Sequence, residues 1–365
     1  MGRTLAYLGN KTKLLDWLEE TMLEVTGWES LEGKFLGDLF SGSGVVTHRF
    51  RERGAATFSN DMELCSAIVT KALGCSTWSL ALCAALEQLN GELASGFHLL
   101  ATPGFFAREY SPLGGRAFWS EENARRLDYL RMRIDEWREL PHEHAFLLAS
   151  LISTADKLSN CPGTYGRWCQ EFKKSALKPL CLRPLHTNET APRPGSSALS
   201  CDSLTMAYPT NLDAVYLDIP YNKRQYSKNV FPISVLTLPA AQQDHLKLGG
   251  KTGIPQQGCY LSPFSQSQEK AGDALRALVQ CQNAEWLFMS YSDEATMPRD
   301  AVVAILETYG EVTLRTHQHA RYKSMVAGNT EVTELLYCVH KWDPSGAKYK
   351  QRRRKLHYFL VNSVV

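Results

Sequence analysis

Two closely spaced glycines between a predicted strand and a predicted helix constrain this chain more than any other feature. Residues 34–40 form an apolar run that favours a strand, and residues 45–53 have the pattern of a helix. Gly42 and Gly44 lie between them, where the backbone at a helix N-terminus can approach a nucleotide-like cofactor closely. The dinucleotide fingerprint has a third glycine where this chain has Thr47, which counts against a nicotinamide or flavin cofactor.

Strands and helices alternate on both sides of this turn, which predicts an α/β fold. A strand over residues 55–60 ends at Asp61 and completes a β-α-β unit. Residues 62–176 are almost wholly helical in pattern, whereas residues 222–268 are rich in Gly, Pro, Gln and Ser and favour a functional loop region. Further strands are predicted near 198 and at 213–217, 285–291, 311–316 and 334–341, with helices at 11–26, 267–281 and 299–309.

A second motif, Asp218-Ile219-Pro220-Tyr221, follows the apolar strand at 213–217. Ligands bind at the carboxyl edge of open α/β sheets, so this motif and the glycine turn are expected to share one cleft. The lone pair of an amino group on a base is delocalised into the ring. A carboxylate and a backbone carbonyl that accept its two hydrogens would localise that lone pair for attack on a methyl group. An adjacent aromatic face would stack a base rotated out of the duplex.

These motifs together resemble the family of adenine-specific DNA methyltransferases that includes the Dam-type enzymes. The resemblance spans nearly the whole chain and runs in the family's order. It rests on the segments YLGNK at residues 7–11, DLFSGSG at 38–44, ND at 60–61, CD at 201–202 and DIPY at 218–221. The segments TADKLSNCPGTYG, KPLCLRPL, YNKRQYSKN, SPFSQ, SYSDE and RYKS resemble further blocks of a restriction-modification subgroup.

The resemblance implies a Rossmann-like methyltransferase core with a mostly parallel seven-stranded sheet and a mainly helical inserted domain. The catalytic domain is expected over residues 1–61 and 196–345, the helical DNA-recognition insertion over 62–195, and a basic tail over 346–365. The implied reaction is site-specific transfer of a methyl group from S-adenosyl-L-methionine (AdoMet) to N6 of adenine in double-stranded DNA. A cognate restriction endonuclease or another defence-system protein is an expected partner.

The resemblance also implies roles for individual residues. The expected catalytic residues are Asp218, Ile219, Pro220 and Tyr221. The expected cofactor-binding residues are Tyr7, Asn10, Lys11, Asp38, Phe40, Ser41, Gly42, Gly44, Asp61 and Asp202. The expected DNA-binding residues are Asn222, Arg224, Gln225, Tyr226, Arg321 and Lys323.

One position departs from the family's D-P-P-Y motif, because Ile219 replaces the first proline. Isoleucine keeps the backbone carbonyl that the chemistry needs but loses proline's fixed φ. Three alternatives to an active adenine enzyme are therefore considered. They are methylation of cytosine N4, which needs the same geometry, a catalytically silent AdoMet- or DNA-binding descendant, and an oxidoreductase based on the two glycines alone.

Composition adds only broad limits. The formal net charge is +2, so binding to a polyanion would have to come from local basic clusters. No apolar stretch approaches the roughly 20 residues that span a bilayer, which favours a cytoplasmic protein without a membrane partner. Two His-x-His pairs, His142/His144 and His317/His319, have no neighbouring Cys or carboxylate at the spacing typical of metal ligands, so surface histidines are expected and no metal is predicted.

Overall fold

The computed structural model describes residues 10–100, 102–222, 225–256, 260–293, 295–320 and 331–342. Four of the predicted site residues and the basic tail at 346–365 lie outside these ranges. These site residues are Tyr7, Arg224, Arg321 and Lys323.

A seven-stranded sheet is the centre of the fold, in the order β3-β2-β1-β4-β7-β9-β8. All its strands run parallel except β9, which pairs antiparallel with both β7 and β8. The predicted α/β class and mostly parallel seven-stranded sheet are therefore confirmed. The strands are β1 (Phe35–Asp38), β2 (Ala56–Asn60), β3 (Ser197–Leu199), β4 (Ala214–Leu217), β7 (Trp286–Ser292), β8 (Gly310–Ala320) and β9 (Glu331–Lys341).

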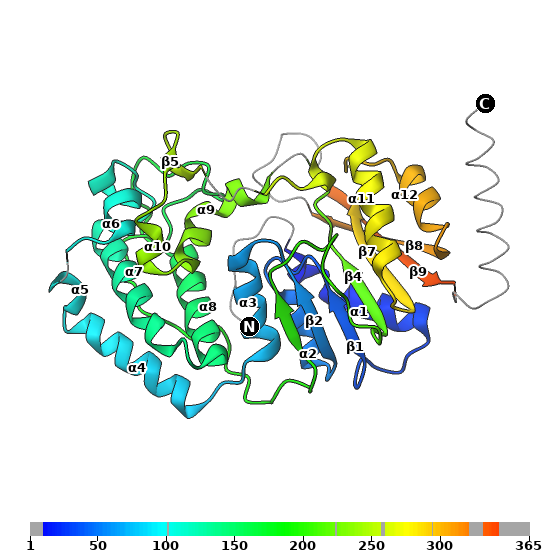
Figure 1. The fold of residues 1–365 in the computed structure, drawn as a ribbon, viewed down its shortest axis with the longest axis horizontal. Coiled ribbons are helices and arrows are strands. Elements are labelled where there is room, and N and C mark those ends of the chain that lie inside the picture. Colours follow the sequence, from blue (N-terminus) through cyan, green and yellow to red (C-terminus); the bar gives the residue numbers. More distant parts are fainter. Residues whose placement is uncertain are drawn as a thin grey trace.

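Helices cover both faces of this sheet, because successive strand residues point to opposite faces. Apolar residues of α1 (Leu15–Thr26) and α2 (Val45–Glu52) pack with one set of strand side chains. Apolar residues of α11 (Gln268–Cys281) and α12 (Arg299–Leu306) pack with the other set. The result is a three-layer sandwich on the right of Figure 1.

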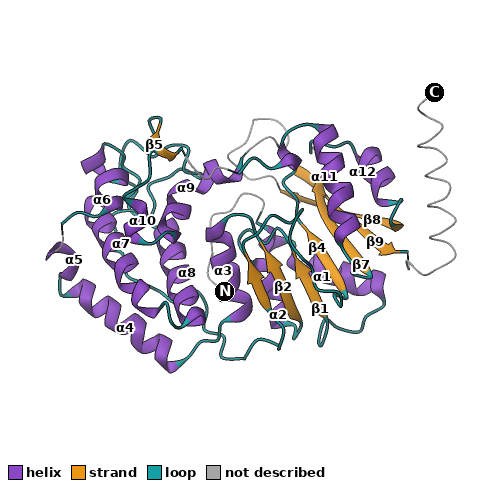
Figure 2. Cartoon of the chain, in the orientation of Figure 1, coloured by secondary structure: helices purple, strands orange, loops and turns teal. Residues whose placement is uncertain are grey.

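A second apolar core is almost entirely helical and lies beside the sheet, as Figure 2 shows. We call its elements outside α3 the helical cluster. They are α4 (Leu80–Ala94), α5 (Phe97–Leu100), α6 (Phe105–Tyr110), α7 (Glu121–Ile134), α8 (Pro141–Lys157), α9 (Tyr226–Thr237), α10 (Ala240–Gln243) and the hairpin of β5 (Leu248–Gly249) and β6 (Ile254–Pro255). None of the described helices is both long and apolar enough to cross a membrane.

Helix α9 corrects the expectation of a loop over residues 222–268. Phe231, Ile233 and Leu236 are buried in the helical cluster, so tertiary packing holds this segment helical. Pro232 lies inside the helix and removes one backbone donor, which explains why the local sequence favoured a loop.

Packing in two places crosses the predicted domain boundaries. Helix α3 (Leu64–Cys75) follows residue 61 but packs against β2, β3 and α2, while also contributing to the helical core. Helix α9 belongs to the segment after residue 196 but packs against α8 and α3. The division into a catalytic and a DNA-recognition domain stays a prediction.

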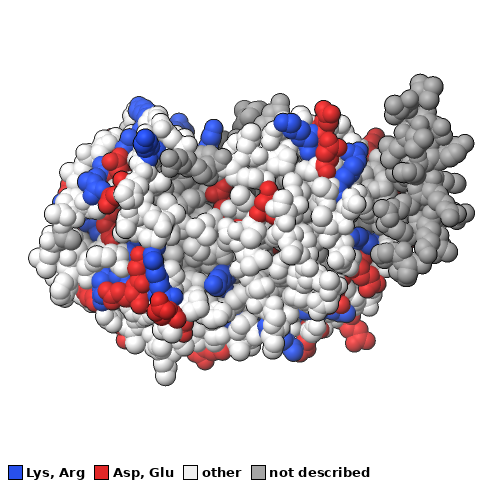
Figure 3. Space-filling view, viewed as in Figure 1, with Lys and Arg blue, Asp and Glu red and all other residues white. Residues whose placement is uncertain are grey.

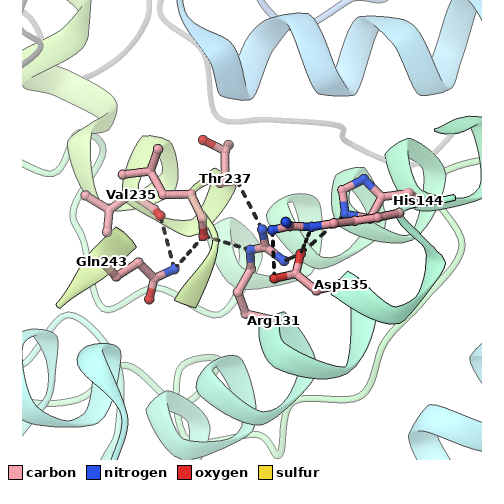
Figure 4. A network of polar contacts seen from close by, with 8 residues as sticks. Arg131, Asp135, His144, Val235, Thr237 and Gln243 are labelled. Carbon is pink, nitrogen blue, oxygen red and sulfur yellow. Dashed lines mark hydrogen bonds and ion pairs between the residues drawn. The ribbon is translucent and has the colours of Figure 1, made fainter. Parts of the chain in front are cut away.

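A buried guanidinium closes the end of α9, as Figure 4 shows. Arg131 of α7 donates to the carbonyl oxygens of Leu238 at 3.0 Å and Thr237 at 3.3 Å, and pairs with Asp135. The amide of Gln243 donates to the same Leu238 carbonyl at 2.9 Å. The last carbonyls of a helix have no hydrogen-bond donor within the helix, and Arg131 supplies donors to them. Its positive charge also interacts favourably with the negative C-terminal end of the helix dipole.

Replacing Arg131 with alanine is expected to reduce the free energy of unfolding by roughly 3 kcal/mol, because it leaves Asp135 and two carbonyls without their buried partner. Urea unfolding followed by tryptophan fluorescence measures the change. Arg138→Ala is the matched control, since Arg138 pairs with the same Asp135 but is 48% exposed. The control should cost less than about 1 kcal/mol. Equal losses in both variants would contradict the capping role.

Candidate active site

A pocket lies at the carboxyl ends of β1, β2 and β4, with about 980 Å³ of empty space counted out to its open mouth. The chain leaves β1 toward β2 on one side, and β4 lies on the other side of β1. This is the switch point at which open α/β sheets bind ligands. The pocket contains the glycine turn, Asp61 and the Asp218 motif together, so the predicted shared cleft is present.

The two glycines of the turn have different surroundings. Both have positive φ, 50° for Gly42 and 74° for Gly44, which few other residues adopt. Gly42 lines the pocket, whereas Gly44 does not. A Cβ on Gly44 would lie 2.8 Å from a methyl carbon of Leu73 and 3.2 Å from the Cα of Thr70. Gly44 therefore allows α3 to pack closely, and Gly42 is the glycine that faces a ligand.

Asp38, at the end of β1, is held by Thr47, which stands where a dinucleotide-binding site has its third glycine. Thr47 donates to Oδ2 of Asp38 from its backbone N–H at 3.1 Å and from its hydroxyl at 2.7 Å. Oδ1 has no hydrogen-bond partner within the described residues, although Asp38 is 1% exposed and lines the pocket. Burial raises the pKa of the Asp38 carboxyl to about 7, against the opposing effect of Thr47.

Asp61 follows β2 and connects the turn to α3. Its carboxylate accepts from the backbone N–H of Gly42 at 2.7 Å and from that of Glu63 at 2.8 Å. Burial raises its pKa to about 6, while these two hydrogen bonds act in the opposite direction. Asn60 joins the next loop through bonds of 3.0 Å in each direction with the backbone of Cys201. The carboxylate of Asp61 is therefore fixed beside Gly42.

Asp202 and three aromatic residues form another wall of the pocket. The hydroxyl of Tyr260 donates to Oδ2 of Asp202 at 3.3 Å. Phe40 packs edge-on against Phe264, with 5.7 Å between ring centroids. Ser41 accepts a 2.9 Å hydrogen bond from the hydroxyl of Thr70 and is buried. All of these except Thr70 line the pocket.

Asp218 follows the end of β4 and lines the same pocket as Asp61. Lys11 pairs with its Oδ1 at 3.0 Å, and the Lys11 ammonium is 5.7 Å from the ring centroid of Tyr221. Burial raises the pKa of the Asp218 carboxyl to about 6, opposed by Lys11 and reinforced by Glu334. Thr296 donates its backbone N–H to the carbonyl of Tyr221 at 2.9 Å, which fixes the end of the motif.

Ile219 points away from the pocket. Its side chain is fully buried in the core formed by β4, β7, β9, α11 and α12, and it is absent from the pocket lining. Pro220 and Tyr221, its neighbours, do line the pocket. The larger side chain at this position is therefore accommodated by the core and occupies no space in the site.

The remaining predicted residues differ in position. Asn10, Gln225 and Tyr226 line the pocket, whereas Asn222 does not. Lys11 lines it too, but its ammonium is paired with Asp218 and Glu334, so its predicted contact with the cofactor stays a prediction. In the described part of the chain, no three His, Cys, Asp or Glu residues are grouped as metal ligands.

Sequence reasoning missed several residues of the pocket and its surroundings. Glu334 does not line the pocket but is the second partner of Lys11, and it lies in the apolar strand ELLYCV, where a lone carboxylate in a buried run was the available signal. Glu63 stands at the start of α3, and burial followed by repulsion from Asp61 raises its pKa to about 7. Four further pocket residues lie in the segments YNKRQYSKN and SPFSQ, which the resemblance singled out without giving these residues a role. They are Ser227, Ser262, Phe264 and Ser265. Tyr216 and Tyr260 also line the pocket, and no local signal sets them apart from core or loop residues.

The chemistry of these groups fits AdoMet. The cofactor has a sulfonium cation, an ammonium group and ribose hydroxyls, all of which carboxylates and aromatic faces bind favourably. Asp38 offers a buried carboxylate oxygen without a hydrogen-bond partner in the described structure, and Asp61 is fixed at the end of β2. Such an orphaned acceptor is costly unless a ligand supplies a donor.

One solved structure resembles the fold only weakly. Magnesium protoporphyrin IX methyltransferase (ChlM) from Synechocystis PCC 6803 with bound SAH aligns with 90% of this chain and 82% of that one, at a TM-score of 0.36 and 8% identity. A likeness of this size supports nothing further.

Sequence relatives identify the chain much more closely. It is 32% identical to the Type II methyltransferase M.CviAII of Paramecium bursaria Chlorella virus 1, over 92% of this chain and 98% of that protein. It is 30% identical to the Type II methyltransferase M.NlaIII of Neisseria lactamica, over 87% of this chain and 92% of that protein. The modification methylase StsI of Streptococcus sanguinis is 29% identical, and this chain aligns with 52% of its length.

The family model of the D12 class N6 adenine-specific DNA methyltransferases matches residues 7–252, which confirms the predicted family and sets the cytosine alternative aside. The enzyme transfers a methyl group from AdoMet to N6 of adenine in DNA. The chain belongs to the D12 class of N6 adenine-specific DNA methyltransferases.

Proposed function

We propose that Asp218 and the backbone carbonyl of Ile219 accept the two amino hydrogens of an adenine that has rotated out of the duplex. The observation that carries this proposal is the position of Asp218, at the end of β4 and inside the pocket that contains Gly42 and Asp61. A base within a duplex cannot reach a group at this depth, so the nucleotide has to be extruded. Tyr221 lines the same pocket and provides the stacking face.

We assign the cofactor to the pocket wall made by Asp38, Gly42, Asp61 and Asp202. When bound, AdoMet supplies an electrophilic methyl group on a positively charged sulfur. The carboxylates make this part of the pocket favourable for a cation, and Phe40 with Phe264 forms an apolar wall for a planar ring. Asp38 is suited to an ammonium or hydroxyl donor because its Oδ1 has no described partner.

Asp218 has a second task once its oxygen has oriented the amino group. Methylation leaves the nitrogen with a proton to lose, and the carboxylate of Asp218 is the nearest proposed acceptor. A carboxyl with a pKa of about 6 is ionised at neutral pH and is more basic than an ordinary aspartate. The proton then passes to solvent through the open mouth of the pocket.

Asp218→Ala is expected to lower the single-turnover rate of methyl transfer by about a hundredfold or more, because it removes the acceptor that orients the amino group. Labelled AdoMet and duplex DNA of mixed sequence serve as substrates. Nucleoside analysis then places the label on N6-methyladenine. Asp273→Ala, on the exposed face of α11, is the control and should retain the wild-type rate. An undiminished rate in D218A would refute the assignment, and a wild-type protein that binds both substrates without turnover would indicate the silent descendant.

The transfer rate is expected to fall as the pH drops through about 6. The pKa of Asp218 is raised, so its active carboxylate form is present above that value and is lost below it. At pH 5 the rate should be about tenfold lower than at pH 7. Asp38, Asp61 and Glu63 also have raised pKa values of about 6 to 7, so their protonation in the same pH range is expected to weaken AdoMet binding. The single-turnover measurement therefore uses saturating AdoMet, which leaves the transfer step as the one that is observed. A flat profile from pH 5 to 8 would contradict the role of Asp218.

We infer that the helical cluster and its hairpin contact the DNA around the extruded adenine. Lys247 and Lys251 are exposed on the β5–β6 hairpin. The buried hydroxyl of Tyr110 donates to the carbonyl of Gly253 at 2.9 Å, and Arg116 donates to that of Lys251 at 3.2 Å, so the hairpin is anchored. In Figure 1 it lies along the upper edge, toward which the parallel strands run.

The surface charge supports this placement. Figure 3 shows Lys and Arg side chains near the upper edge, over the hairpin region and over the region of α11 and α12. Acidic side chains lie in the area between them. Basic groups on both sides of an acidic pocket would hold phosphates at the rim while leaving the cation-binding carboxylates at the centre.

A Lys247→Ala/Lys251→Ala variant is expected to raise the Michaelis constant for DNA and to reduce the slope of log affinity against log salt by about 2, because two phosphate contacts are lost. The maximal rate should change little. Arg193→Ala is the control, since Arg193 is an exposed cation near the start of β3, at the opposite edge of the sheet. Salt slopes that are equal in wild type and double variant would place the DNA elsewhere.

We further propose that the enzyme works beside an endonuclease of the same specificity. Two of its relatives are named Type II methyltransferases and a third a modification methylase. The protective methyl group in such a pair has to lie within the sequence that the nuclease cleaves.

A further inference from the structure

One buried lysine near the start of the chain is shared between two carboxylates, one from the middle of the chain and one from its C-terminal part. The ammonium of Lys11 is 3.0 Å from Oδ1 of Asp218 and 3.1 Å from Oε1 of Glu334. The side chains of Lys11 and Glu334 are only 4% and 5% exposed, whereas that of Asp218 is 19% exposed. Asp218 is therefore the member of this triad that a substrate can reach, and Glu334 lies behind it.

The topology of the sheet explains how Glu334 arrives there. Strand β9 is the antiparallel strand, so its first residues lie at the edge where the parallel strands end. Glu334 is in register with Ser292 at the end of β7 and with His317 of β8. Leu336, two residues on, belongs to the apolar core under α1 and α2, so Glu334 starts a side-chain row that is otherwise apolar.

A carboxylate in such a row is expensive to bury, and its ion pair with Lys11 offsets part of that cost. Asp218, Glu334, Tyr216 and Tyr221 are the titratable groups that act on Lys11. Burial lowers the pKa of Lys11, but these acidic neighbours outweigh burial and hold the pKa well above its usual value. Lys11 is therefore a permanent cation between two carboxylates.

We propose that Glu334 is a positioning residue for the methyl transfer, which draws Lys11 to one side of Asp218 so that Oδ2 stays available to the amino group of the adenine. The proposal rests on the catalytic role of Asp218 given above. A lysine ammonium carries three donors, and without a second anion it could turn fully onto Asp218 and compete with the amino group for both oxygens. Glu334 opposes this by attracting the ammonium, whose nitrogen lies 3.1 Å from its Oε1.

Glu334 also acts on the charge of Asp218. Its negative charge raises the pKa of the Asp218 carboxyl, in the same direction as burial and against Lys11. Removing the charge of Glu334 while Lys11 stays in place lowers the pKa of Asp218, so the acid limb of the rate profile moves to lower pH and the carboxylate becomes a weaker acceptor.

Glu334→Gln tests the proposal, because it keeps the size and one oxygen acceptor but removes the charge. Single-turnover transfer from labelled AdoMet to duplex DNA, measured from pH 5 to 8, should have a plateau about tenfold lower than wild type. Its acid limb should lie at lower pH. The Michaelis constants for AdoMet and DNA should stay within about twofold of wild type. Glu311→Gln on β8 is the matched control, since Glu311 is an exposed strand glutamate, and should match wild type throughout.

A double-mutant cycle with Lys11→Met separates positioning from simple structural support. If Glu334 acts through Lys11, then E334Q should change the rate less than about twofold in the K11M background. Equal effects in both backgrounds would overturn the proposal. A wild-type plateau and acid limb in folded E334Q would do the same.

A second variant covers the case in which E334Q does not fold. Glu334→Asp keeps the charge but withdraws the carboxylate by one methylene, and it should lower the plateau several-fold with unchanged Michaelis constants. A wild-type rate in E334D would overturn the proposal. The two assignments can fail separately. An active D218A variant would refute the catalytic role of Asp218. An inactive D218A variant together with wild-type rates in the Glu334 variants would refute only the positioning role of Glu334.

Discussion

The parallel pairing of β1 with β4 is the constraint on which the site depends. Asp38 is in register with Tyr216, so the residues that follow each strand emerge side by side although about 180 positions separate them. The approach is close, because a Cβ on Gly37 would lie 3.1 Å from a methyl carbon of Val215. Without this pairing the glycine turn and the Asp218 motif would be unrelated loops. With it, they form two walls of one pocket.

Features encoded by short contiguous segments were predictable from the sequence. The strand and helix around Gly42, the strand ending at Asp218 and the seven strands of the sheet follow from local apolar periodicity and turn residues. The position of Asp61 at the end of β2 follows in the same way. Each of these depends on which residues are neighbours in the chain, which is the information that a single sequence contains.

Features that depend on long-range packing were not predictable. Helix α9 contains Pro232 and polar neighbours, and only burial of its apolar side against the helical cluster makes it a helix. Glu334 is a lone acid in an apolar strand, and its partner Lys11 is over 300 residues away. Ile219 looked like a change in the active site, but its side chain belongs to the core. Strand register and side-chain direction decide these cases, and neither is visible locally.

The chain enters the helical cluster twice, through α4–α8 between β2 and β3, and through α9 to β6 between β4 and β7. The first excursion follows α3, which begins next to Asp61 and Glu63, and the second begins a few residues after Tyr221. A rigid rotation of the cluster would therefore pull on both walls of the pocket at once. It also follows that the unit cannot be exchanged between relatives as one contiguous segment, because a single segment would leave behind side chains of the other excursion that pack in the same core.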